Sequence, residues 1–238
     1  ESAADARVNI LGLLNVLEAS VREEVQAFIF ASSGGVLYGD VWEPAGEEHP
    51  ALPVSPYGIS KLTGEHYLRF FAFQYNLRCA ALRYGNVYGP RQDPHGEVGV
   101  VAIFLQRLLK GEVPVINGDG RYIRDYVYVG DVARANLLAL QGEWLGFRAF
   151  NLGTGWGTDV NQLEGKLRAA LADVLRERGE GVELPSPIYG PPRPGDLRSS
   201  LLDAGRAGQE LDWHPQVGLE EGLKRTAAWF AGFAGRKR

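Results

Sequence analysis

The sequence predicts an α/β protein built on a doubly wound parallel sheet. Helical and strand patterns alternate through its first half, from a helix over residues 5–20 to a strand over residues 78–84. Strands that alternate with helices in this way form parallel sheets with right-handed crossovers. The expected strands are short, continuous apolar runs, which is typical of strands that are buried on both faces. With 238 residues, 45% of them hydrophobic, the chain can bury a sizeable core.

The elements of the first half follow from periodicity and from local start signals. Leu11, Leu14 and Leu17 recur at helical spacing near the beginning of the chain. Ser55 and Pro56 form a typical helix start, because proline is favoured in the first helical turn. The expected elements are a helix over 5–20, a strand over 26–31, a loop over 39–55, a helix over 57–76 and a strand over 78–84.

The second half continues with alternating patterns. Asp131 is expected to cap a helix, and the NGDG run at residues 117–120 is a tight-turn signal before a strand. The expected elements are helices over 98–110, 131–140, 161–178, 203–211 and 219–233 and strands over 114–116, 122–129 and 150–153.

Composition and charge exclude several classes of function. The net charge of −4 provides no domain-wide basic excess, so we expect no nucleic-acid partner. No apolar run is long enough to span a bilayer and no signal peptide begins the chain, so we expect no membrane partner. Cys79 is the single cysteine, which excludes an internal disulfide and favours a cytoplasmic location. The four histidines are scattered without the spacing of metal ligands, so we predict no metal site.

The beginning of the chain predicts that part of a domain lies upstream. The sequence contains no Met, and residues 1–7 already resemble the start of a helix. No Gly-x-Gly-x-x-Gly run follows an early strand, although such a loop cradles the phosphates of a dinucleotide. We therefore expect a glycine-rich cofactor loop, within about two further βαβ units of roughly 30 residues each, upstream of Glu1.

Tyr57 and Lys61 form a pair that suggests proton and hydride chemistry on an alcohol. Residues four apart on a helix lie on one face, so the ammonium can act on the phenol. A phenol has a pKa of about 10 and needs a nearby cation to act as a base at neutral pH. Ser33 follows the 26–31 strand, at the carboxyl edge where ligands bind in open α/β sheets, and offers a hydroxyl to the same alcohol.

These residues also have plain structural interpretations. A Tyr–Lys pair occurs by chance on many helices, and a serine after a strand can simply cap backbone groups. Gly34 and Gly35 allow either a close backbone approach or a tight turn. Cys79 lies in an apolar strand and is expected to be part of the core.

The motifs together resemble the extended short-chain dehydrogenase/reductase family, in its NAD-dependent epimerase/dehydratase branch. The resemblance covers essentially the whole chain. It implies a Rossmann-like sheet, incomplete at the N-terminus, with a smaller α/β substrate-binding domain. The motifs that carry it, in the family's order, are FASSGGVLYG, SPYGISK, LRYGNVYGPRQDP, NGDGRYIRDYVYVGDVARAN, FNLGTG and RPGDLRSSLLD.

The resemblance implies a role for each matching residue. Tyr57 would be the general base, Lys61 would lower its pKa and hold the nicotinamide ribose, and Ser33 would bind the sugar 4-hydroxyl. The remaining cofactor contacts would come from Asn9, Ser32, Tyr84, Gly85 and Val87, and the substrate contacts from Asn86, Arg124, Arg193 and Asp196. Arginine forks suit phosphate oxygens, and a carboxylate accepts hydrogen bonds from sugar hydroxyls.

The catalytic serine remains open between two neighbours. Counting back from Tyr38 places Gly34 at the family's serine position, whereas counting forward from the strand places Ser33 there. Glycine has no hydroxyl, so we choose Ser33 and keep Ser32 as the alternative.

The resemblance also implies a function, a cofactor and an assembly. The function would be NAD-dependent epimerisation at C4 of a nucleotide sugar, of the UDP-glucose/UDP-galactose type, through a 4-keto intermediate. A 4,6-dehydratase or decarboxylase of the same family is the first alternative, and a non-catalytic NAD-sensing protein is the second. Dehydratases of the family look like Ser/Thr-Asp-Glu at the Ser33 site, whereas this chain has Gly34 and Gly35. The expected partners are the nucleotide sugar and, in a homodimer, a second copy that packs against the helices at 5–20 and 57–76.

The expected division into domains is discontinuous. An NAD-binding domain would comprise residues 1–90 and 126–155, and a nucleotide-sugar-binding domain residues 91–125 and 156–238. The sequence leaves open which nucleotide and which sugar are used.

Overall fold

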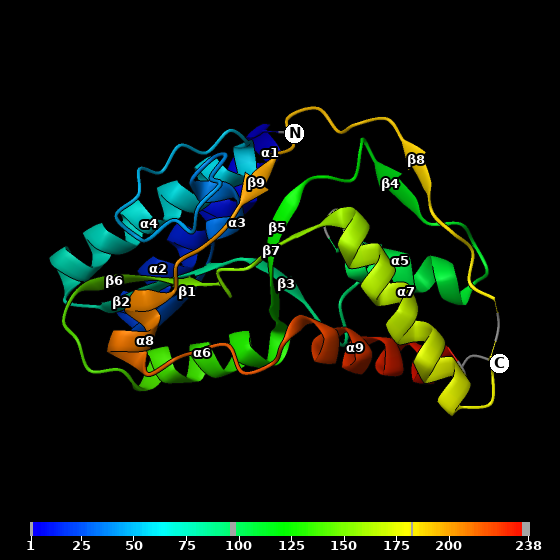
Figure 1. The fold of residues 1–238 in the computed structure, drawn as a ribbon. Coiled ribbons are helices and arrows are strands. Elements are labelled where there is room, and N and C mark those ends of the chain that lie inside the picture. The colour runs from blue at the N-terminus through cyan, green and yellow to red at the C-terminus, as the bar shows by residue number, and fades with distance from the viewer. Residues whose placement is uncertain (1, 96–98, 182, 235–238) are drawn as a thin grey trace.

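The computed structural model describes residues 2–95, 99–181 and 183–234. Figure 1 shows two lobes. One holds β1, β2 and β6 with the helices around them, and the other is built from α5, α7 and α9. Strands β3, β5 and β7 lie between the two lobes and connect them.

The first lobe is a parallel sheet of the predicted kind. Strands β1 (Ala27–Ser33), β2 (Arg78–Tyr84) and β6 (Phe147–Leu152) pair in the order β1-β2-β6, and both pairings are parallel. Figure 1 shows α4 (Pro56–Tyr75) on one side of this sheet and α6 (Val129–Gln141) on the other. The predicted doubly wound α/β fold is confirmed.

The first predicted helix begins earlier and is not continuous α-helix. It comprises α1 (Ser2–Ala6), a π-helical turn η1 (Arg7–Leu11) and α2 (Gly12–Arg22). In a π-turn the backbone hydrogen bonds join residues five apart instead of four apart. The spacing of the leucines does not reveal this change.

Helix α4 starts where local sequence signals place it. The Ser55 hydroxyl accepts a hydrogen bond from the Gly58 backbone N–H at 3.1 Å, and Pro56 occupies the first turn. The helix ends at Asn76, whose left-handed φ of 52° terminates it. Before α4, Gly34–Leu37 form a short helix, α3, where the sequence suggested a turn.

Strand β5 is the centre of the sheet between the lobes. It comprises Ile123–Tyr128 and pairs in parallel with β3 (Asn86–Tyr88) and β9 (Ser199–Ser200), and antiparallel with β7 (Gly157–Asp159). The C-terminal segment thus returns to the middle of the molecule through β9.

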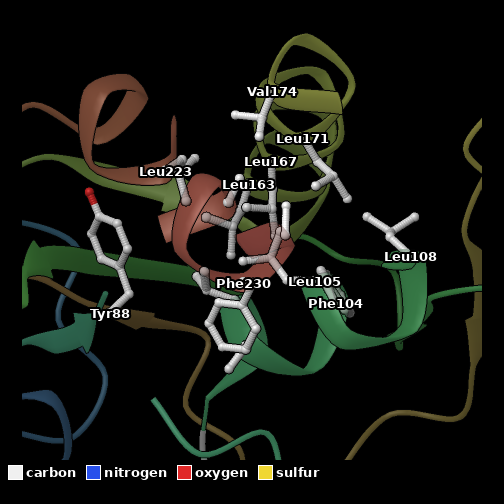
Figure 2. Packing of buried hydrophobic residues seen from close by; sticks show 14 of the residues in the cluster. Tyr88, Phe104, Leu105, Leu108, Leu163, Leu167, Leu171, Val174, Leu223 and Phe230 are labelled. Atoms are coloured by element: carbon white, nitrogen blue, oxygen red, sulfur yellow. The ribbon is translucent and has the colours of Figure 1, made fainter. Parts of the chain in front are cut away.

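The second lobe is held by helices packed around an aliphatic core. Helices α5 (Val100–Leu109), α7 (Val160–Glu177) and α9 (Leu219–Ala234) surround it. Figure 2 shows leucines at helical spacing on α7 facing residues of α5 and α9. A small parallel pair, β4 (Val115–Asn117) and β8 (Ile188–Gly190), completes the lobe. Val98, the predicted first residue of the α5 helix, lies outside the described residues.

Two expectations differ in detail from the structure. Asp131 does not cap α6, because the helix begins at Val129 and the buried Asp131 carboxylate instead pairs with Arg134 and accepts from the Val217 backbone N–H. The predicted helix at 203–211 is α8 (Gly205–Leu211), which packs against the first lobe although the sequence division assigns it to the second domain.

No helix among the residues that the structure describes is both long enough and apolar enough to cross a membrane.

Candidate active site

The structure brings Ser33, Tyr57 and Lys61 together at the carboxyl end of β1. Ser33 ends β1, and Tyr57 and Lys61 lie one turn apart at the start of α4. The Lys61 Nζ is 5.3 Å from the centroid of the Tyr57 ring and donates to the Ala31 carbonyl at 2.9 Å. Ser33 is the N-terminal cap residue of α3, yet its side chain makes no capping hydrogen bond. The Ser33 hydroxyl is close enough to the Tyr57 phenol to lower the pKa of that phenol.

The electrostatics of the pair are set by burial and by one acid. Burial raises the pKa of the Tyr57 phenol, the hydrogen bond from Ser33 lowers it, and the Asp5 carboxylate raises it. Burial lowers the pKa of Lys61, and Asp5 opposes that shift. Overall, the pKa of Lys61 is lowered and the pKa of Tyr57 is raised, which favours the neutral phenol. An additional positive charge is therefore required to form the Tyr57 phenolate near pH 7.

Asp5 is a residue that sequence reasoning missed. Its carboxylate accepts a hydrogen bond from the Ser60 hydroxyl and another from Asn9 Nδ2, the latter at 3.0 Å. These contacts fasten the N-terminal helical segment to the start of α4. Asn9, predicted to lie near the cofactor, is therefore placed in the π-turn with its amide held by Asp5. A signal was available in the four-residue spacing of Asp5 and Asn9 on one helical face.

Ser32 and Ser33 point to different partners, as successive residues of a strand do. The Ser32 side chain is buried and donates to Glu65 Oε1 at 2.6 Å, whereas Ser33 lies beside Tyr57. Gly35 lies between the side chains of Asn86 and Ser33, because a β-carbon there would lie 3.4 Å from Asn86 Oδ1 and 4.0 Å from Ser33 Oγ.

The remaining predicted cofactor residues lie where β2 passes into β3. The Tyr84 ring packs toward α6, where its phenol accepts from Asn136 Nδ2 at 3.0 Å. Gly85 permits a close approach, since a β-carbon there would be 2.8 Å from the Asp125 carbonyl oxygen. The Val87 carbonyl accepts from Gln92 Nε2 at 2.9 Å.

The predicted substrate residues form a second group on β5 and the segment before β9. Arg124 Nη2 donates to Asp196 Oδ1 at 2.6 Å, so two predicted substrate residues already contact each other. The Arg193 side chain is exposed in the turn that contains Asp196. Asp40 holds this segment from the other lobe by accepting from the backbone N–H groups of Arg198 and Ser199.

The described residues contain no group of three or more His, Cys, Asp or Glu side chains that could hold a metal ion.

A parallel α/β sheet with a strand-end hydroxyl beside a Tyr–Lys pair defines a protein of the short-chain dehydrogenase/reductase class. The family model of the NAD dependent epimerase/dehydratase family matches residues 1–153. The chain belongs to this family.

Several UDP-glucose 4-epimerases are similar to this chain in sequence and in structure. The UDP-glucose 4-epimerase of Mycolicibacterium smegmatis is 43% identical over 227 residues, which cover 95% of this chain and 69% of that protein. A crystal structure of UDP-glucose 4-epimerase with UDP-glucose from Thermotoga maritima is 50% identical with a TM-score of 0.88, covering 98% of this chain and 72% of that one. The UDP-glucose 4-epimerase complex with NAD from Thermus thermophilus is 44% identical with a TM-score of 0.83, covering 95% and 71%. A dTDP-glucose 4,6-dehydratase of Actinoplanes sp. is more distant, at 32% identity over 93% of this chain and 65% of that protein.

Proposed function

We propose that this protein is an NAD-dependent epimerase that inverts C4 of a nucleotide sugar of the UDP-glucose/UDP-galactose type. The observation that carries the proposal is the meeting of Ser33, Tyr57 and Lys61 at one strand end, in a chain 43–50% identical to UDP-glucose 4-epimerases. We assign the cofactor to residues 1–90 and 126–155 and the sugar to residues 91–125 and 156–238.

The chemistry of the donor set fits the nicotinamide ribose. An ammonium, a phenol and a hydroxyl lie together at the carboxyl edge of the sheet, where ligands bind in this fold. Lys61 and Tyr57 would hold the ribose hydroxyls. Bound NAD would supply a reversible acceptor for the C4 hydride, so the overall reaction would have no net oxidation.

The chain's own residues move and hold the proton. Tyr57 removes the proton of the 4-hydroxyl as phenolate, helped by the Lys61 ammonium about 5 Å from its ring and by the positive charge of the oxidised cofactor. Ser33, beside the phenol, donates to the same sugar oxygen and orients it. On return, the neutral Tyr57 gives the proton back to the 4-oxygen.

Epimerisation also requires the sugar to present both faces while its diphosphate stays bound. Arg124 and Arg193 would bind the diphosphate, Asn86 would reach the same group, and Asp196 would accept from the nucleotide ribose. The Arg124–Asp196 pair would then open to accept the nucleotide.

Two alternatives are less favoured. A 4,6-dehydratase or a decarboxylase of this family would use other groups beside Ser33, but Gly34 and Gly35 carry no acid for elimination. Gly34 is also packed, since a β-carbon there would lie 2.6 Å from the Leu202 side chain. A non-catalytic NAD-sensing protein would not require the Ser–Tyr–Lys set.

The proposal includes a cytoplasmic homodimer. Phe70 and Phe73 on α4 and Val16 on α2 are 50%, 87% and 53% exposed, and these helices are the ones expected to pack against a second copy. Sedimentation of the protein and of Phe73→Glu would test this, since a buried glutamate at the contact is expected to shift dimer toward monomer.

The function is tested by incubating the protein with UDP-galactose. The expected result is UDP-glucose at equilibrium without net reduction of NAD. A 4-keto-6-deoxy sugar product would replace the epimerase with the dehydratase alternative, and no turnover of any nucleotide sugar would remove the proposal.

A further inference from the structure

A buried charged cluster lies directly behind the Ser33–Tyr57 contact, and no step of the proposed reaction uses it. Glu65 lies one turn beyond Lys61 on α4, and its side chain is 4% exposed. It accepts from Ser32 Oγ at 2.6 Å and from Arg83 Nη2 at 2.6 Å and Nε at 3.0 Å. Glu65 therefore joins α4 to both β1 and β2.

The other side of the cluster is equally well bonded. Arg83 Nη1 donates to the Tyr38 phenol at 2.7 Å and to the Glu47 carbonyl at 3.1 Å. The Tyr38 phenol donates to Asn151 Oδ1 on β6 at 2.8 Å. Although burial lowers the pKa of the Arg83 guanidinium, its bonds to Glu65 raise it overall, so the guanidinium stays charged.

Stability alone does not account for such a cluster. Desolvating two charges costs about as much as their attraction returns, and apolar side chains of the same volume stabilise a core equally well. What an ion pair with fixed hydrogen bonds adds is a single geometry, because its bonds lengthen and weaken when the elements slide. Because the cluster bonds α4 to β1 and β2, it holds the position of this helix relative to these two strands.

That geometry is the register of α4 on β1. Ser32, which bonds Glu65, is the direct neighbour of Ser33, and Lys61, one turn before Glu65, bonds the carbonyl of Ala31. A shift of α4 by one residue moves it about 1.5 Å along its axis and breaks these bonds together. The same shift would separate Tyr57 from Ser33.

We propose that Glu65, held by Arg83 and bonded to Ser32, is a positioning residue that sets α4 on β1 so that Tyr57 meets Ser33. The inference rests on the proposed epimerase function, in which Tyr57 and Ser33 share the sugar 4-oxygen.

The cluster acts through position and not through its own charge. The charged groups that face Tyr57 are Asp5 from the N-terminal segment and Lys61 from α4, and Ser33 faces it from β1. Glu65 is neutralised by Arg83. A looser Ser32–Glu65 contact would therefore reach Tyr57 only by weakening its hydrogen bond with Ser33, which raises the pKa of the phenol.

Ser32→Ala removes the contact without leaving a buried charge unpaired. We expect kcat for epimerisation to fall about tenfold with KM changed less than about twofold, because a small misplacement affects the reacting geometry more than binding. We also expect the acidic limb of the pH profile, where the Tyr57 phenolate becomes protonated, to move to higher pH. Ser32→Thr, which restores a hydroxyl, should recover most of the kcat.

Two comparisons separate position from general destabilisation. Ser20→Ala removes another buried serine hydroxyl, one that bonds within its own helix to Val16, and should leave kcat and the pH profile unchanged. Tyr38→Phe removes the far end of the cluster and should lower kcat less than Ser32→Ala does. Parent values of kcat and pH midpoint in Ser32→Ala would overturn the proposal.

An ultraviolet titration of Tyr57 keeps the inference separate from the proposed function. The titration of the parent minus that of Tyr57→Phe gives the midpoint of this phenol, whether or not a sugar is turned over. Ser32→Ala should raise that midpoint, and an unchanged midpoint would contradict the positioning role. Absence of epimerase activity in the parent, with the midpoint raised, would refute the function and leave the positioning role supported.

Discussion

Two ion pairs of equal length differ in their burial and in their further partners. Glu65–Arg83 and Arg124–Asp196 both have a shortest N–O distance of 2.6 Å. Glu65 and Arg83 are 4% and 8% exposed and also bond Ser32, Tyr38 and the Glu47 carbonyl. In the second pair Arg124 is 12% exposed, and Asp196 is 38% exposed and belongs to a turn. The length of an ion pair therefore does not indicate its role, while burial and the number of further partners do. We therefore propose that the buried pair stays closed and that the more exposed pair opens when Arg124 binds the nucleotide sugar.

The largest expected effect comes from removing one partner of the buried Glu65–Arg83 pair. Arg83→Met leaves Glu65 buried without its cation, and we expect the free energy of unfolding to fall by about 3–5 kcal/mol. Urea denaturation followed by circular dichroism measures it. Arg168→Met, which unpairs Glu164 from a half-exposed arginine, is the matched control and should cost less. An equal decrease in the free energy of unfolding in both variants would show that the Glu65–Arg83 pair stabilises the fold no more than the Glu164–Arg168 pair does.

The exposed pair should affect binding more than folding. Arg124→Ala would remove the charge-assisted hydrogen bonds that we propose Arg124 makes to the diphosphate, each worth about 1.5–3 kcal/mol. We expect KM for the nucleotide sugar to rise about 10–100-fold with a smaller change in kcat, measured by steady-state kinetics. A fall in kcat at constant KM would place Arg124 at the reacting centre instead.

Asp196→Ala should have little effect on stability. A partly exposed ion pair contributes about 0.2–1 kcal/mol, so the urea midpoint should stay close to that of the parent. A loss comparable to that of Arg83→Met would mean that the second pair is structural and would remove the distinction between the two.

The smallest expected effect concerns Cys79, near the start of β2. The thiol is fully buried, and burial raises its pKa to about 12. Because the thiolate is the reactive form, alkylation by iodoacetamide at pH 8 should be very slow in the folded protein and fast in urea. Rapid labelling of the folded protein would indicate that β2 opens readily.

The sequence predicted best what local signals encode. Ser55 and Pro56 located the start of α4, and hence Tyr57 and Lys61, because capping depends on neighbouring residues. The alternating apolar runs predicted the parallel sheet, because each strand carries its own pattern. The assignment of each site residue to cofactor or substrate stays a prediction.

Long-range polar contacts were beyond such reasoning. Glu65 and Arg83 are 18 residues apart on different elements, and nothing in their spacing names them as partners. A signal existed, since an arginine within the apolar run RCAALRY must find an anion when it is buried. The choice between Ser32 and Ser33 likewise depends on which face of β1 each side chain takes.

The most direct test of the account is Tyr57→Phe, compared with the parent for C4 epimerisation and for nucleotide-sugar binding. Positioned acid–base catalysis is worth about 10²–10⁴-fold, so we predict a loss of kcat in that range. The dissociation constant, measured by isothermal titration calorimetry, should change little because the diphosphate contacts remain. Epimerisation at the parent rate in Tyr57→Phe would contradict the central claim that this phenol carries the proton.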